Sequence, residues 1–425
     1  EGEAGAVLGQ EGQGAAKVSQ RYLDEKIDDY FSSSEDEDHY GEIRMQPCLF
    51  QDDLIRSSNN INNTRNGNIK LEQAMKEMAL EIHPTKSCYI VCGGKKFKEE
   101  VNKETSTDPV MFGSLQLERK ASVTYLGDEL SELGLAASVT ATVSAREAKV
   151  KGAIFELKAL CEDYRMQVVG GMVGAIDIYE TCIVPSLLAN SGIWLNIDEK
   201  TVKRLDAIQH LFIKQLLHLP NSTPVPSLRA ITSQLGMKWR VWQEKCLLVR
   251  AIRRQEEGCL AREMLQEQIS RGWPGLAAEV TEICKNIGLK DACREDVEKE
   301  DIKEAIFYHH YASMKAEMSP NGQVLEKLRG LVDRDLTSPQ DYLKSSCLAE
   351  ARMAARVQLN MVRCPGNMAG LYRGRMSCEA CAPWREEGEV GPVQTQEHMT
   401  VCPAYRFLQQ QYGDRMWNFE WLTHY

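Results

Sequence analysis

Residues 48–55 read CLFQDDLI, an apolar run that is interrupted by two adjacent aspartates, Asp52 and Asp53. Inside a strand the two carboxylates would repel each other, and one would point inward because side chains alternate between the two faces. Residues 43–50 and 54–57 on either side have the composition of extended chain. The run therefore predicts two antiparallel strands joined by a turn that carries both aspartates.

The aspartate pair has two interpretations. Aspartate is common in turns, which would make Asp52 and Asp53 part of an ordinary loop. Two carboxylates at the tip of a hairpin can instead hold Mg²⁺ through their oxygens, and a pair of such ions stabilises the attacking and leaving oxygens in phosphoryl transfer. Residues 48–55 contain no Gly, Pro or Asn that would favour a tight turn, and this favours the metal-binding interpretation.

Length and charge limit the kind of protein this is. The chain has 425 residues, enough for two or three domains, and its net charge is −10. Any site for a polyanion must therefore be a local basic surface. The sequence has no apolar leader at its start and no uncharged apolar stretch of about 18 residues, so we expect neither a membrane span nor an oxidising compartment for its 14 cysteines. An intracellular location fits these features.

The first part of the chain mixes strand and helix patterns, whereas the part after about residue 140 is mainly helical. The expected elements of the first part are a helix over 18–31, a polar connection over 59–68 with an Asn-Gly turn, a helix over 71–82, a strand over 87–93 and a strand over 121–130 with a turn at Gly127. Farther along, residues 198–220 predict a helix with Asp198 as its N-cap and Pro220 after its end, and Pro224 and Pro226 predict a loop.

Four potential metal ligands lie near the end of the chain. Cys378 and Cys381 are separated by two residues, and His398 and Cys402 by three. These spacings suit tetrahedral Zn²⁺, and four filled positions indicate a structural rather than a catalytic ion. The alternative is four unrelated residues in a chain that is rich in cysteine.

Two residues beside these ligands have side chains that suit nucleic acid. Trp384 and Arg385 offer stacking and cationic contacts, although each alone is also an ordinary surface residue.

Several motifs, in order, resemble those of reverse transcriptases over residues 9–240. FQDD (50–53) resembles the aromatic-x-Asp-Asp signature of that family. The other matching segments are EGQGAAKVS (11–19), similar to the Gln-Gly motif before the palm helix; PTKS (84–87), with its lysine; TYLGDEL (124–130), similar to the primer-grip hairpin; and YETCIVPSLLANSGIWL (179–195), similar to the thumb of non-LTR (LINE-type) retrotransposon polymerases. The metal-ligand pattern resembles the Cys-Cys-His-Cys zinc knuckle that follows the thumb in those proteins.

The resemblance implies an α+β fold with four parts. These are a partial palm of antiparallel strands and helices with the primer grip (1–130), a helical thumb (131–240), a helical linker region (241–365) and the zinc knuckle (366–425).

The resemblance also implies roles for individual residues. Asp52 and Asp53 would bind the catalytic Mg²⁺, and Gln13 and Gly14 would lie beneath the templating base and the incoming nucleotide. Lys86 would lie near the nucleotide phosphates, and its alternative is a solvated surface lysine. Tyr125, Leu126 and Gly127 would support the primer terminus.

The implied activity is RNA-directed DNA polymerisation, in which a DNA primer is extended on an RNA template. Members of the family carry a further catalytic aspartate and the fingers before the Gln-Gly motif, and this chain begins at that motif. We therefore expect a missing N-terminal part of the same polyprotein, and no polymerase activity from residues 1–425 alone. The resemblance implies a ribonucleoprotein of nucleus and cytoplasm.

Two other classes of protein remain as alternatives. The first is a catalytically inactive relic whose thumb and zinc knuckle only bind nucleic acid. The second is a maturase of the group II intron type, which is less favoured because its C-terminal module does not usually carry this knuckle.

Overall fold

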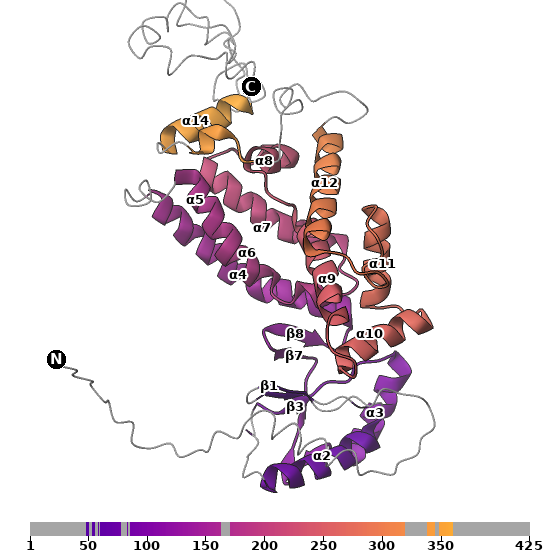
Figure 1. Ribbon diagram of the computed structural model, residues 1–425. Helices are drawn as coiled ribbons and strands as arrows, with labels where there is room; N and C mark the ends of the chain where they lie inside the picture. Colours follow the sequence, from indigo (N-terminus) through magenta and orange to yellow (C-terminus); the bar gives the residue numbers. More distant parts are fainter. Residues whose placement is uncertain are drawn as a thin grey trace, which may run out of the picture. The chain divides into compact units, whose positions relative to one another are not determined.

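The computed structural model describes residues 48–50, 53–55, 58, 60–77, 83, 86–162, 171–318, 338–344 and 348–359 (Figure 1). The chain divides into two compact units, Glu1–Gly134 and Leu135–Tyr425. The first unit mixes short strands with helices, and the second is helical, so the expected α+β class is confirmed at this level. Within the described residues, no helix has the length and apolar character to cross a membrane.

The aspartate-containing run forms the predicted antiparallel hairpin. Strand β1 (Cys48–Phe50) pairs with β2 (Asp53–Ile55), and the register places Phe50 opposite Asp53. Of the expected strands 43–50 and 54–57, residues 43–47, 56 and 57 lie outside the described residues, and β2 begins at Asp53 itself. Only two residues therefore separate the strands, and this is the commonest loop length for hairpins.

Helix α2 (Ile61–Glu77) corrects the prediction of a polar turn over residues 59–68. Asn60 caps the helix, because its side-chain oxygen accepts a hydrogen bond of 2.7 Å from the backbone N–H of Asn63. Asn68 is buried, and its side-chain amide donates to the carbonyl of Met111 at 2.9 Å. These contacts hold the Asn-Gly sequence in a helix, so tertiary structure overrides its local preference for a turn.

The rest of the first unit consists of short strand pairs around a small apolar core. Its elements are β3 (Cys88–Tyr89) parallel to β6 (Glu118–Arg119), α3 (Lys95–Thr107), β4 (Met111–Phe112) antiparallel to β5 (Leu115–Gln116), and β7 (Ser122–Tyr125) antiparallel to β8 (Asp128–Ser131). The strand expected over 87–93 is thus only two residues long. The segment 121–130 is a hairpin that turns at Gly127, as its sequence indicates.

The second unit is built from helices of very different lengths. They are α4 (Leu135–Glu162), α5 (Gly171–Ile178), the π-helix η2 (Tyr179–Ile183), α6 (Val184–Leu188), the 3₁₀ helix η3 (Ser191–Ile193), α7 (Glu199–Leu217), α8 (Val225–Thr232), α9 (Met237–Arg253), α10 (Leu260–Arg271), α11 (Leu276–Asn286), α12 (Lys299–Met318), the 3₁₀ helix η6 (Asp341–Lys344) and α14 (Leu348–Gln358). Helix α4 packs against both α6 and α7 (Figure 1).

The helix boundaries follow the sequence at one end of α7 and depart from it at α8. Asp198 caps α7 as predicted, with its carboxylate accepting from the N–H of Thr201 at 2.7 Å. Pro224 and Pro226 predict a loop, but Pro226 lies in the first turn of α8. A proline is tolerated there because the first N–H groups of a helix have no partner within the helix.

Helix α9 joins two apolar cores of the second unit. Met237 and Val241 belong to a core formed mainly by α4 to α8, whereas Cys246 and Val249 belong to a core shared with α10, α11 and α12. The expected boundary between residues 240 and 241 lies within this helix. The helix therefore belongs to both parts of the unit.

A buried ion pair fixes α9 against α11. Lys245 is 2 % exposed, and its ammonium group donates to a carboxylate oxygen of Glu279. The other oxygen of Glu279 accepts from the N–H of Asn196 at 2.7 Å. One carboxylate thus holds α9 and the chain before α7 at the same point.

We expect Glu279→Ala to destabilise the second unit by about 3 to 5 kcal/mol, because it leaves the charge of Lys245 buried and unpaired. The measurement is chemical denaturation followed by the tryptophan fluorescence of the protein. Glu282→Ala, which removes an exposed carboxylate from the same helix, serves as the control and should change the free energy of unfolding by less than about 0.5 kcal/mol. Equal effects of the two substitutions would show that the pair does not hold the helices together.

Candidate functional site

The predicted metal-binding pair lies at the end of the β1–β2 hairpin. Asp53 is the first residue of β2, and Asp52 and the loop before it lie outside the described residues. The ladder ends at the pair Phe50 and Asp53, so Asp53 stands at the end of the hairpin ladder rather than in its middle. Carboxylate oxygens are the ligands that Mg²⁺ prefers.

Lys86 lies in a turn before β3 and is exposed. Its backbone N–H donates to the carbonyl of His83 at 3.3 Å, and Ser87 donates to the same carbonyl at 3.2 Å. The side chain of Lys86 is therefore exposed to solvent at this turn. This exposure fits both the phosphate-binding role and the alternative of a solvated lysine.

Tyr125, Leu126 and Gly127 come together at the turn of the β7–β8 hairpin. Tyr125 pairs with Asp128, so Leu126 and Gly127 form a two-residue loop. Their φ angles are 48° and 82°, which is the sign that a two-residue hairpin loop of type I′ requires at both positions. Glycine adopts such angles freely, but leucine does so only with strain. Leu126 is nevertheless 43 % exposed at the tip, where an apolar side chain gains little from burial.

We expect Leu126→Gly to stabilise the β7–β8 hairpin by about 1 kcal/mol, because it removes the strain of a left-handed leucine. Hydrogen exchange of the amides in residues 122–131 measures the effect directly. Leu133→Gly is the control, since Leu133 is 78 % exposed and has no positive φ. That substitution should leave protection unchanged or lower it, and a loss of protection in Leu126→Gly would contradict the strain argument.

The remaining predicted site residues lie outside the described residues. They are Gln13, Gly14, Asp52, the zinc ligands Cys378, Cys381, His398 and Cys402, and the nucleic-acid contacts Trp384 and Arg385. In the part of the chain that the structure describes, no group of three or more His, Cys, Asp or Glu side chains is placed to hold a metal ion. The zinc site and the template-binding residues stay predictions.

The thumb-like segment 179–195 has an irregular backbone. It begins as the π-helix η2, continues through α6, and ends in η3. A π-turn within a helix is uncommon and is frequent at functional sites. Tyr179, the first residue of η2, stacks on Phe212 with ring centroids 4.0 Å apart and planes 3° apart. Burial raises the pKa of the Tyr179 phenol, so the hydroxyl is neutral.

A cluster of polar side chains surrounds the α8–α9 loop, which comprises Ser233 to Gly236. Two side chains donate to the carbonyl of Leu235: the amide of Gln209 and the guanidinium Nε of Arg240, each at 2.9 Å. Arg240 also pairs with Glu180 of η2 at 2.6 Å. Hydrogen bonds to the loop backbone thus connect the loop to α7 and α9, and Arg240 connects it further to η2.

Arg229 and Asp206 form the charged centre of this cluster. The guanidinium of Arg229 is almost fully buried and lies 2.7 Å from a carboxylate oxygen of Asp206. The same oxygen accepts from the N–H of Met237, the first residue of α9, at 3.0 Å. Gly236 lies so close to the guanidinium that a Cβ there would meet Arg229 Cζ at 3.0 Å. A larger residue at Gly236 would therefore displace Arg229.

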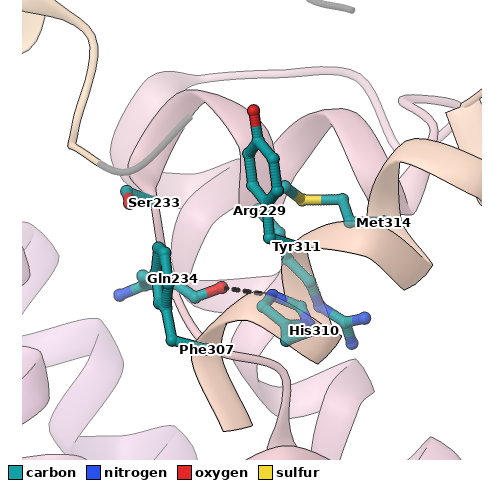
Figure 2. Close-up of a pocket in the computed structure, with 7 residues that line it drawn as sticks. All are labelled: Arg229, Ser233, Gln234, Phe307, His310, Tyr311 and Met314. Atoms are coloured by element: carbon teal, nitrogen blue, oxygen red, sulfur yellow. Dashed lines mark hydrogen bonds between the residues drawn. The ribbon is translucent and has the colours of Figure 1, made fainter. Parts of the chain in front are cut away.

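A small pocket opens beside the cluster (Figure 2). Its lining residues are Arg229, Ser233, Gln234, Phe307, His310, Tyr311 and Met314, and its empty volume is about 180 Å³ including the open mouth. Typical ligand pockets have at least about 300 Å³. The pocket is therefore too small for a nucleotide or a similar ligand.

His310 connects α12 to the α8–α9 loop. Its Nε2 lies 3.3 Å from the carbonyl of Gln234, as the dashed line in Figure 2 shows, and a carbonyl can only accept. The Nε2 atom therefore carries the proton, and Nδ1 is buried without a partner among the described residues. Burial, followed by the charges of Arg229 and Arg240, lowers the pKa of His310 from its ordinary value of 6.5 to about 4.

We expect the second unit to lose stability as the pH falls from about 6.5 to about 4, by on the order of 3 kcal/mol from His310. The folded pKa lies below the unfolded one, so the unfolded chain takes up a proton first and acid favours unfolding. Burial also lowers the pKa of His210 on α7, to about 3, and this adds to the same trend.

The variant His310→Gln keeps a donor for the Gln234 carbonyl but does not titrate. Denaturation at neutral and at mildly acidic pH should show a smaller loss of stability in this variant. His309→Gln, at an exposed position of the same helix, is the control and should retain the full pH dependence. An unchanged pH dependence in His310→Gln would contradict the assignment.

The comparisons with known proteins do not place the chain in a family. No protein-family model, curated protein or solved structure matches it. The functional interpretation therefore depends on the residues themselves and on the motifs that they form.

Sequence reasoning missed the cluster around the α8–α9 loop. Arg229, Asp206 and Arg240 are charged, and charged residues are usually exposed, so their separate positions in the sequence gave no indication that they meet. The only available signal was Gly236, which follows a polar stretch and precedes an apolar helix pattern.

Proposed function

We propose that the chain is part of an RNA-directed DNA polymerase of the non-LTR retrotransposon type. The observation that carries the proposal is the register of the β1–β2 hairpin, in which Phe50 faces Asp53 across a two-residue loop. This register supports the hairpin setting that the proposed function needs for the FQDD sequence. The β7–β8 turn, with its exposed Leu126, supports the proposal at a second motif.

In the proposed reaction a primer 3′-hydroxyl attacks the α-phosphorus of a deoxynucleoside triphosphate. A phosphodiester bond forms, the bond between the α- and β-phosphates breaks, pyrophosphate leaves, and the hydroxyl proton passes to solvent. Two Mg²⁺ ions, when bound, would stabilise the attacking and leaving oxygens. Asp52 and Asp53 would hold these ions through carboxylate oxygens, and the chain around Tyr125 to Gly127 would support the primer end. Lys86 would contribute positive charge near the triphosphate, and the proposed zinc knuckle, with Trp384 and Arg385, would contact nucleic acid.

The metal site can be tested without an activity assay. Fe²⁺ bound in place of Mg²⁺ generates radicals that cut the polypeptide next to the ion. With the full chain we expect cuts near residues 48–55 that excess Mg²⁺ suppresses and that Asp52→Asn and Asp53→Asn each abolish. Asp128→Asn is a matched control, because Asp128 occupies in the β7–β8 hairpin the place that Asp53 occupies in β1–β2.

Binding of a DNA primer on an RNA template separates the proposal from its alternative. A polymerase should prefer a recessed primer end, and Tyr125→Ala should reduce this preference. Binding without end preference, together with no cuts near residues 48–55, would instead support an inactive protein that only binds nucleic acid.

A further inference from the structure

Helix α4 is apolar on two opposite sides. One side belongs to the core of the second unit, with Val143, Val150, Ile154, Leu157 and Cys161 buried. A helix at the surface of a globular protein normally presents polar residues on the side facing away from the core. Along much of α4 that side instead carries small and apolar residues.

The outer side of α4 has a regular pattern. Ala145, Ala148, Gly152, Phe155 and Ala159 follow one another at alternating spacings of three and four residues, and all five are exposed. We call this surface the outer α4 face. A repeat of three and four residues keeps such a line on one side of a helix and is the pattern by which two helices pack along their length.

The face has a projection and a hollow. Phe155 is 53 % exposed. At Gly152, an added Cβ would meet no atom within 4 Å, so the surface above this glycine is open. Alanines on either side keep the backbone accessible, and small residues of this kind allow two helices to approach closely.

Two charged residues beside the outer α4 face indicate which partner it binds. Lys149 and Glu156 are exposed, and neither forms an ion pair within the described residues. They lie at equal distances in sequence from the midpoint between Gly152 and Ala153. In an antiparallel pair of α4 helices centred there, Lys149 of each copy therefore lies beside Glu156 of the other. A second copy in that orientation therefore supplies the complementary charge for both residues, whereas a parallel copy would place like charges together.

We propose that the outer α4 face binds a second copy of this chain, with the two helices antiparallel and related by a two-fold axis near Gly152. In this arrangement Phe155 of each copy lies over Gly152 of the other, and Ala148 lies near Ala159. The midpoint of these pairs is one residue from the midpoint between Lys149 and Glu156, a shift of about 1.5 Å that the long charged side chains can span. Two ion pairs between Lys149 and Glu156 flank the contact. Such an interface is isologous, as two-fold dimers require.

The size of the contact sets its strength. One helix face buries less than the roughly 800 Å² per partner that stable complexes bury. The dimer should therefore be weak, with association that appears in the micromolar range or above, at about 1 to 100 µM.

Sedimentation velocity of the full chain over this range of concentration is the first test. We expect a monomer of 48.0 kDa at the lowest concentration and a reversible shift toward the dimer at the highest. Gly152→Leu fills the hollow and should abolish the shift. Ala136→Leu adds the same bulk at an exposed position on another side of α4 and should leave it unchanged.

Charge reversal gives the decisive test of orientation. Lys149→Glu alone places four carboxylates at the contact, and Glu156→Lys alone places four ammonium groups, so each should weaken association at least about tenfold. The double variant Lys149→Glu/Glu156→Lys restores opposite charges and should restore association. High salt should lessen both the loss of association in each single variant and its restoration in the double variant.

Two outcomes would overturn the proposal. A chain that stays monomeric at every concentration has no such interface. If Lys149→Glu lowers affinity for an RNA–DNA duplex and the double variant does not regain it, the face contacts nucleic acid instead. Failure of either kind leaves the metal-site test at Asp52 and Asp53 unaffected, because that test does not depend on association.

Discussion

The second unit depends on the buried ion pair between Arg229 and Asp206. The carboxylate of Asp206 binds both the guanidinium and the first N–H of α9, so a single side chain sets where α9 begins. Removing a charged pair from water is costly unless further hydrogen bonds satisfy it. The N–H of Met237 supplies such a hydrogen bond to Asp206, whereas the Nε of Arg229 has no partner among the described residues. Gly236 packs against the guanidinium, and Gln209 and Arg240 hold the neighbouring carbonyl of Leu235 in place. Helices α7, α8, α9 and α12 therefore meet around the four-residue α8–α9 loop.

Prediction from sequence succeeded where local chemistry decides the structure. Two adjacent aspartates in an apolar run can be accommodated at a hairpin end, and the β1–β2 register agrees. The Leu126-Gly127 turn and the Asp198 cap are likewise local, since each depends on residues within three positions along the chain. The extent of the strand over 87–93 was overestimated, because pairing partners and not composition determine where a strand ends.

Prediction failed where distant residues decide. The helical conformation of the Asn-Gly sequence within α2 depends on the hydrogen bond between Asn68 and Met111, and strand β3 and helix α3 lie between these residues in the sequence. The cluster at the α8–α9 loop joins residues from five elements, and its charged members look like surface residues when they are read singly. Of the candidate catalytic site, the hairpin setting of Asp53 and the turn at Tyr125 to Gly127 were predictable. The convergence of the metal ligands is a tertiary property that no spacing alone can establish.

The π-helix η2 has a consequence for how this helix can change by insertion and deletion. A π-turn accommodates one more residue than the same length of α-helix, so the five residues Tyr179–Ile183 hold an extra position that the helix has absorbed. Deleting a single residue there would restore a regular helix between α5 and α6. Because the wider turn has already absorbed the extra residue, the residues before and after the deletion would keep nearly the same faces. A deletion in a regular stretch of α-helix would instead rotate the two halves by about 100° relative to each other. The π-turn is therefore the place in this helix where the chain can lose one residue without turning α5 or α6 away from the elements that they contact.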